Sequence, residues 1–77
     1  MKVIGIRRID INNDRGAYHG YKYYCTDKDD NVAGVITDTF TISDRVANEL
    51  PRDIALDDEV IPVYKRESKV VRSVIIM

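Results

Sequence analysis

The fold is indicated most clearly by residues 36–51, which have the sequence ITDTFTISDRVANELP. Its first part belongs to an extended segment over 32–42, in which apolar side chains share one face and threonines share the other. Ser43 or Asp44 can then cap a short helix over 44–50, which the following proline ends. This stretch therefore predicts a strand that passes directly into a short helix.

Four more strand-like segments flank this unit. Residues 2–11 and 21–26 precede it, and residues 60–66 and 69–77 follow it as an expected hairpin that turns at 67–68. A strand-strand-strand-helix-strand-strand order in 77 residues predicts a mainly β protein, a five-stranded OB-type barrel whose helix lies between strands 3 and 4. An SH3-like barrel has similar strand content, so it stays an alternative.

The first strand carries a slip in its apolar alternation. Apolar residues stand at Ile4 and Ile6 and then at Ile9 and Ile11, so the pattern shifts by one residue across 7–8. A shift of this kind predicts a β-bulge at 7–8 in a long, strongly bent strand.

Length and composition favour one small intracellular domain over residues 1–77. A chain of 77 residues, 44% of them hydrophobic, has room for one modest core. Two arginines precede any apolar run long enough for a signal peptide, and no stretch approaches the roughly 18 residues of a membrane span. The single cysteine, Cys25, excludes an internal disulfide. We expect a cytoplasmic protein without a membrane partner.

Charge is strongly segregated along the chain. The net charge is +3 over residues 1–25, −7 over 26–59 and +3 over 60–77, although the whole chain carries only −1. If the two basic ends fold beside each other, they form a cationic face that suits an anionic partner. The acidic middle is the main argument against a strong nucleic-acid binder.

Aromatic side chains gather in one of the basic segments, in the run YHGYKYY at residues 18–24. On a strand, Tyr21 and Tyr23 share one face, while Lys22 and Tyr24 share the other. Both faces cannot be core, and we expect the lysine-bearing face to present a tyrosine to solvent for stacking on a base. The alternative is that these tyrosines are ordinary strand residues at a barrel rim.

A second concentration of cations lies at the turn of the expected terminal hairpin. Residues 64–69 have the sequence YKRESK, with an aromatic ring beside three cations. A mobile basic hairpin can follow a phosphate backbone, because Lys and Arg release counterions where they touch phosphates. The alternative is a solvated turn that is charged for solubility.

Catalytic and metal-binding patterns are missing from the sequence. His19 is the only histidine and Cys25 the only cysteine, and no orienting third group accompanies them. No phosphate loop or metal motif is present. We expect a protein that is not an enzyme and needs no cofactor or metal.

The chain resembles the small helix-destabilising, single-stranded-DNA-binding proteins of filamentous phages and related bacterial mobile elements. The resemblance lies in the length, the strand order, the opening IGIRRID (residues 4–10), GYKYY (20–24) and the closing VYKR (63–66) with Lys69. It implies an OB-type barrel that forms a homodimer and coats single strands with little sequence specificity, as in phage or plasmid replication or transfer. By this similarity the residues that contact nucleic acid would be Arg7, Arg8, Arg15, Tyr18, Tyr21, Lys22, Tyr24, Tyr64, Lys65, Arg66 and Lys69.

Two questions stay open at this point. DNA is the expected partner, but composition does not separate DNA from RNA, because that choice depends on contacts to the 2′-hydroxyl. The alternative function is a small barrel that acts as a protein-interaction or assembly module, with its acidic middle facing a basic partner. The apolar end, Val74 to Met77, is a candidate for the dimer edge.

Overall fold

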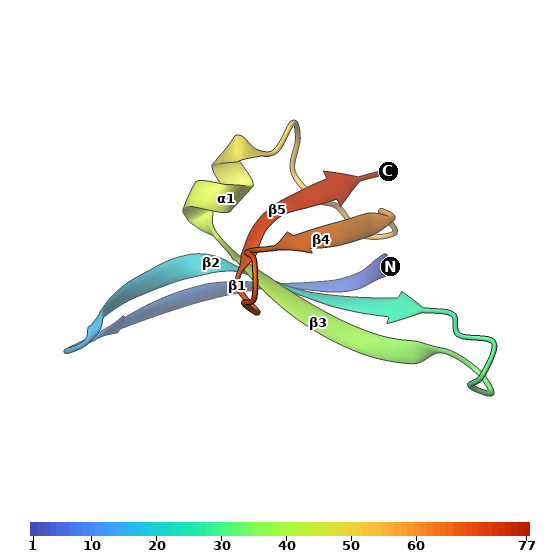
Figure 1. Ribbon diagram of the computed structural model, residues 1–77. Coiled ribbons are helices and arrows are strands. Elements are labelled where there is room, and N and C mark those ends of the chain that lie inside the picture. Colours follow the sequence, from blue (N-terminus) through green and yellow to red (C-terminus); the bar gives the residue numbers. More distant parts are fainter.

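The computed structural model describes all residues from 1 to 77 and contains five strands and one helix (Figure 1). The mainly β class and the predicted order of elements are confirmed. In chain order the elements are β1 (Lys2–Asn13), β2 (Gly16–Asp27), β3 (Ile36–Ser43), α1 (Asp44–Glu49), β4 (Val60–Tyr64) and β5 (Val71–Ile76).

All ladders are antiparallel, and they form two sheets. One sheet has the order β1-β2-β3, and the other contains β4 and β5. Figure 1 shows the β4–β5 hairpin lying over the middle of the longer sheet, while the β1–β2 turn and the β2–β3 connection extend beyond it at opposite ends. An isolated antiparallel bridge between Lys2 and Glu59 joins the two sheets.

The core lies between these two sheets. Nine apolar side chains are buried there, and they come from every strand and from the loop before β4. Because alternate residues of a strand point to opposite faces, each strand supplies only part of its length to this core. The buried side chains are those of Val3, Tyr23, Cys25, Phe40, Ile42, Ile54, Val60, Val71 and Val74.

β1 and β2 form a hairpin that is longer than the sequence suggested. The polar stretch before residue 21 is mostly strand, since only Asp14 and Arg15 form the turn. Asn13 Oδ1 accepts a hydrogen bond from Arg15 N at 2.9 Å, and Gly16 adopts a φ of 121° that favours glycine. The turn-forming residues are thus concentrated in one tight turn, and their neighbours extend the strands.

The bulge in β1 lies at Ile4, so its prediction at residues 7–8 was wrong. The register with β2 shifts between Val3 and Gly5 and then continues without interruption to Asn13. Ile11 is 49% exposed on the projecting hairpin. The apolar alternation slips because β1 leaves the core toward its projecting end. Outside the core, apolar side chains no longer have to alternate.

The transition from β3 to α1 follows the predicted local signals. Ser43 has an extended backbone, and its Oγ accepts a hydrogen bond from Val46 N at 3.3 Å, so Ser43 is the N-cap. The expected strand over 32–42 begins later, at Ile36, because Val32 N donates to Asp29 O and closes a turn there. Val46, Ala47 and Leu50 pack against the core and hold this short helix in place.

The terminal hairpin turns where predicted, but its strands are shorter. Glu67 has a φ of 56°, which identifies the turn, and Lys65 N donates to Val70 O at 2.8 Å to close it. β4 ends at Tyr64 and β5 begins at Val71, so the basic residues lie in a projecting turn. The one helix, α1, has only six residues, which is too short to span a membrane.

Candidate nucleic-acid interface

The face of the three-stranded sheet that points away from the core carries basic and hydroxyl side chains in cross-strand rows. In one row, Arg7, Lys22 and Thr41 stand opposite one another on β1, β2 and β3. In the next row, Tyr24 stands between Gly5 and Thr39. Side chains directly opposite in antiparallel strands lie close enough to interact, so each row forms a continuous strip.

Tyr24 is held against the sheet by its neighbours in these rows. A Cβ atom added at Gly5 would lie 3.4 Å from the Tyr24 side chain, so the ring covers the glycine directly. Lys22 Nζ lies 5.4 Å from the centroid of the same ring, within cation–π range. The ring therefore helps to orient the ammonium group of Lys22 on this face.

A groove of about 540 Å³ separates this sheet face from the β4–β5 turn. Tyr64 and Lys69 form one wall from the turn, and Lys22 with the outer threonines of β3 forms the other. The Tyr64 side chain is 43% exposed, so its ring is available to a ligand. We call this hollow the β3 groove, and its lining residues are Lys22, Asp38, Thr39, Phe40, Thr41, Tyr64, Ser68 and Lys69.

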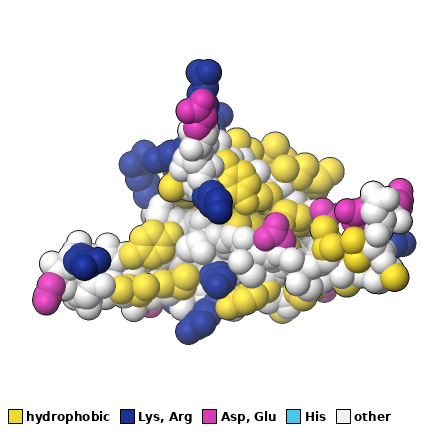
Figure 2. Space-filling view, turned by 60° about the horizontal axis from the view of Figure 1, so that its bottom comes forward, with side chains coloured by type: hydrophobic (Ala, Val, Ile, Leu, Met, Phe, Trp, Pro, Cys, Tyr) yellow, Lys and Arg dark blue, Asp and Glu magenta, His cyan; other side chains and the backbone are white.

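The cations around the β3 groove are not neutralised by carboxylates. Ion pairs in the structure use the N-terminus, Lys2, Arg8, His19, Arg45 and Arg52, and none involves Lys22 or Lys69. Arg7 also lacks an ion pair and stands directly opposite Lys22. Like charges in opposite positions oppose folding, so this arrangement favours an anionic ligand over a purely structural role. Figure 2 shows Lys and Arg side chains in the middle of this face and on the projecting turn.

Arg8 and Tyr21 lie on the opposite face of the sheet from Lys22. The Arg8 guanidinium lies 4.9 Å from the centroid of the Tyr21 ring and donates to both Asp10 and Asp44. These hydrogen bonds, first to Asp44 and then to Asp10, raise the pKa of Arg8 and lower the pKa of both carboxyl groups. Both side chains are already engaged with their own chain, and Tyr21 also packs against the core.

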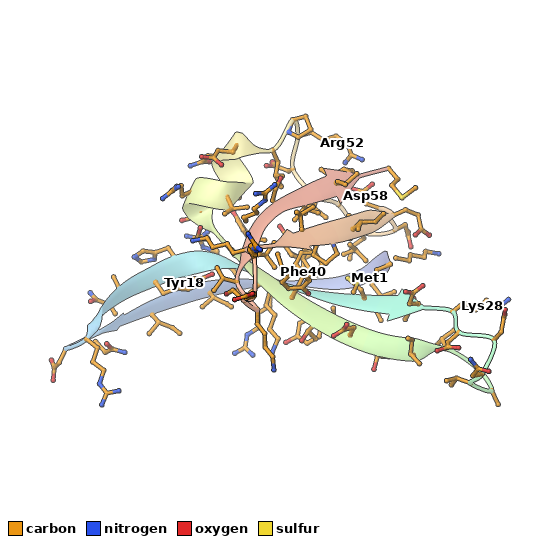
Figure 3. The ribbon with its side chains drawn as sticks, in the orientation of Figure 1. Met1, Tyr18, Lys28, Phe40, Arg52 and Asp58 are labelled. Carbon is orange, nitrogen blue, oxygen red and sulfur yellow. The ribbon has the colours of Figure 1, made fainter.

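The remaining residues expected to bind nucleic acid are distributed beyond the groove. Arg15 lies at the tip of the β1–β2 hairpin, and Arg66 lies in the β4–β5 turn. Lys65 lines a separate small hollow beside α1. Tyr18 is 38% exposed and lines a recess of about 270 Å³ that also contains Lys69. Figure 3 shows Tyr18 and Phe40 on the two sides of the β4–β5 turn.

The groove also contains polar residues that were not expected to line a site. Thr39, Thr41 and Ser68 offer hydroxyl groups, and Asp38 contributes the only carboxylate of the lining. The sequence identified the threonines as an exposed strand face, which is an ordinary feature of sheets. Only the pairing of β2 with β3 reveals that they stand beside Lys22 and Tyr24.

The acidic middle of the chain does not form a single surface. Asp57 and Asp58 precede β4, where Asp57 pairs with Lys2 at 3.6 Å and Asp58 with Arg52 at 2.7 Å. The hydrogen bonds from Arg52, and secondarily from the Ala55 backbone, lower the pKa of Asp58. Figure 3 shows Arg52 and Asp58 near each other beside the loop before β4, away from the β4–β5 turn. These carboxylates lie outside the groove lining.

The potential catalytic and metal-binding side chains are separated or buried. Cys25 is buried, and this burial raises the pKa of its thiol. His19 Nδ1 contacts Asp10 Oδ1 at 2.8 Å on the exposed hairpin. No group of three or more His, Cys, Asp or Glu side chains is arranged to hold a metal ion. The β3 groove is therefore the strongest candidate site.

No protein-family model, curated protein or solved structure matches the chain. Function is therefore inferred from the β3 groove and its lining residues.

Proposed function

We propose that the chain is a partly open OB-type barrel that binds single-stranded DNA with little sequence specificity. Two contacts support the barrel arrangement between β1 and β4. Val3 N donates to Asp58 O at 2.9 Å, and Val60 N donates to Met1 O at 2.8 Å. β5 contacts β3 on the other side, and α1 lies between β3 and β4 as in the OB order.

The observation that carries the functional proposal is the position of the β3 groove. In OB-folds, the face of strands 2 and 3 and the loops beside it bind oligonucleotides. The β3 groove joins that face, through Lys22 and the threonines, to Tyr64 and Lys69 of the β4–β5 turn. Basic and aromatic groups meet here from segments that are far apart in the sequence. The resemblance to phage single-stranded-DNA-binding proteins points to the same partner.

Each type of side chain has a plain role in such binding. Lys22 and Lys69 would contact phosphates, and the exposed Tyr64 ring would stack on a base. The threonine hydroxyls can rotate to donate hydrogen bonds to phosphate or sugar oxygens of the bound DNA strand. Stacking and phosphate contacts tolerate every base, so this lining favours coating of a strand over reading of its sequence. Such a protein would serve the replication or transfer of a phage or plasmid.

A homodimer is part of this proposal. On the outer face of the β4–β5 sheet, Ile61 stands opposite Ile75, and they are 45% and 52% exposed. Met77 extends the apolar stripe and is 74% exposed. A second copy would remove this stripe from water, so Ile75→Lys should convert a dimer to a monomer in sedimentation measurements. A wild-type chain that sediments as a monomer at high concentration would contradict the dimer.

Fluorescence anisotropy with labelled oligo-dT at two salt concentrations tests DNA binding. We expect binding tighter than ~10⁻⁴ M at low salt and a clear loss of affinity as salt rises. Lys22→Gln and Lys69→Gln should each make the plot of log affinity against log salt concentration less steep by about 0.7. Affinity no better than ~10⁻⁴ M at low salt, or affinity without salt dependence, would contradict the proposal.

The exposed apolar stripe favours a second candidate function, a protein-interaction or assembly module. In that case the stripe of Ile61, Ile75 and Met77 would contact a different protein, and the β3 groove would bind no nucleic acid. The same anisotropy experiment separates the two functions, because the module predicts no DNA binding at any salt concentration.

A further inference from the structure

The β3 groove continues into two smaller hollows beneath the β4–β5 turn. It shares Thr41 and Lys69 with the recess of about 270 Å³ that holds Tyr18. That recess in turn shares Ser43, Val70 and Val71 with a third hollow of about 120 Å³. The shared lining residues place the three hollows next to one another in a row along β3 toward α1.

The third hollow is basic, and we call it the α1 hollow. Its charged lining consists of Arg45 from α1, Lys65 from the turn, Arg72 from β5 and one carboxylate, Glu49. Lys65 and Arg72 form no ion pair. Arg45 Nε lies 4.0 Å from Glu49 Oε1, and their side chains are 89% and 65% exposed. An exposed pair at this distance binds weakly and leaves the guanidinium available.

The recess that holds Tyr18 lies between the β3 groove and the α1 hollow, and it offers apolar surface. The Tyr18 ring is 38% exposed there, and Val70 is 54% exposed. Burial, and secondarily the charge of Asp44, raises the pKa of the Tyr18 hydroxyl, so this side chain is neutral near pH 7. A neutral ring between two basic hollows suits a DNA strand whose base stacks on the ring while the phosphates on either side lie in the hollows.

We propose that the α1 hollow is a second phosphate-binding site for the same single strand that occupies the β3 groove. This inference rests on the proposed DNA-binding function. From Asp38 to Ser43 the row of hollows follows β3 for roughly 17 Å at about 3.3 Å per residue. A DNA strand that fills the β3 groove and also reaches Arg45, Lys65 and Arg72 must therefore span several nucleotides. This length is within the range of about 4–16 nucleotides that OB-folds cover.

The length of the oligonucleotide gives a direct test. A very short oligo-dT, of about two nucleotides, can fill the β3 groove alone, whereas one of about twelve can also reach the α1 hollow. Lys65→Gln and Arg72→Gln should each lower the salt slope for the longer oligonucleotide by about 0.7 and leave the shorter one unchanged. Lys28→Gln is the matched control, because it removes the same charge from the β2–β3 connection, away from the three hollows.

Different results would contradict DNA binding itself and the second phosphate site in the α1 hollow. If the wild-type protein binds neither oligonucleotide, the proposed function itself is contradicted. If the wild-type protein binds both but Lys65→Gln and Arg72→Gln behave like Lys28→Gln, only the second site is contradicted. Equal weakening of both lengths would also overturn it, because the α1 hollow would then not be a separate site. Circular dichroism melts of each variant show that the fold is retained.

Discussion

Arg8 Nη2 lies 2.9 Å from Asp44 Oδ2, and this contact joins the middle of β1 to the first residue of α1. Asp10 accepts from the same guanidinium at 3.0 Å, so Arg8 bridges two carboxylates. The bridge fixes the helix on the inner side of the sheet, and it leaves the outer side to Arg7 and Lys22. Neighbouring arginines thus have different roles, one in structure and one in the proposed binding face.

The bridge predicts a pH-dependent contribution to stability. Hydrogen bonds from Arg8 lower the pKa of Asp10 and Asp44 below the ordinary value of 3.8. A carboxyl group whose pKa is lowered by folding stabilises the fold above its unfolded pKa and loses that effect as the pH falls through its folded pKa. Arg8→Gln should therefore lower Tm near neutral pH, and the difference from wild type should shrink below about pH 3.8.

Thermal melts across this pH range check the prediction. Arg7→Gln is the control, because Arg7 forms no ion pair and stands opposite Lys22, so its loss should not lower Tm. A Tm difference for Arg8→Gln that stays the same at acid and neutral pH would contradict the role of the two carboxylates.

Gly20 should be essential for the pairing of β2 with β3. A Cβ atom at this buried position would collide with the backbone carbonyl oxygen of Ile42, which cannot move without breaking the ladder. Gly20→Ala should destabilise the fold by about 1–3 kcal/mol or more in denaturant unfolding. Gly5→Ala should cost less, since its Cβ would meet the Tyr24 ring at 3.4 Å. Equal stability of Gly20→Ala and wild type would show that the β2–β3 register differs from this structure.

Tyr64 should contribute to DNA binding through its exposed ring. Tyr64→Ala should weaken oligo-dT binding by about 1–3 kcal/mol, or roughly 5- to 150-fold, with little change in Tm. Tyr64→Phe should keep most of the affinity, because stacking needs the ring and not the hydroxyl. Anisotropy titrations of both variants measure this difference, and equal loss in the two variants would argue against stacking.

Asp38 should weaken the binding that the rest of the groove favours. Its carboxylate is the only one in the lining, and Asp38 Oδ1 accepts a hydrogen bond from Thr39 N at 2.8 Å. Asp38→Asn can keep that hydrogen bond while it removes the repulsion of phosphate, so affinity should rise by about 0.2–1 kcal/mol. Asp30→Asn removes the same charge outside the groove, and anisotropy should show a smaller effect. A loss of affinity in Asp38→Asn would mean that the carboxylate itself binds the ligand.

Local signals in the sequence predicted much of the fold. The alternation before Ser43, the Ser43 cap and the turn at residues 67–68 each depend on neighbours within a few residues, and each appears in the structure. The bulge was misplaced because the apolar pattern cannot tell where the β1–β2 hairpin leaves the core. Ile11 belongs to the projecting part, where burial no longer sets the alternation, and Ile9 stands just before it, opposite Gly20, the first residue of β2 that pairs with β3.

The candidate site was predictable only in part, because it depends on strand pairing and on distant partners. The lysine-bearing face of β2 was expected to be the outer one, and the structure places Lys22 and Tyr24 there. The engagement of Arg8 depends on Asp44, 36 residues away, which no local pattern reveals. The inclusion of Thr39 in the groove likewise follows from its register opposite Tyr24.

An NMR titration of the ¹⁵N-labelled protein with oligo-dT tests directly whether single-stranded DNA binds in the β3 groove. We predict that the backbone amide signals of Lys22, Thr39, Thr41, Tyr64 and Lys69 shift together, while those of Asp57 to Glu59 stay in place. A spectrum that does not change at saturating oligonucleotide, or shifts that centre on the acidic loop before β4, would contradict DNA binding in the β3 groove.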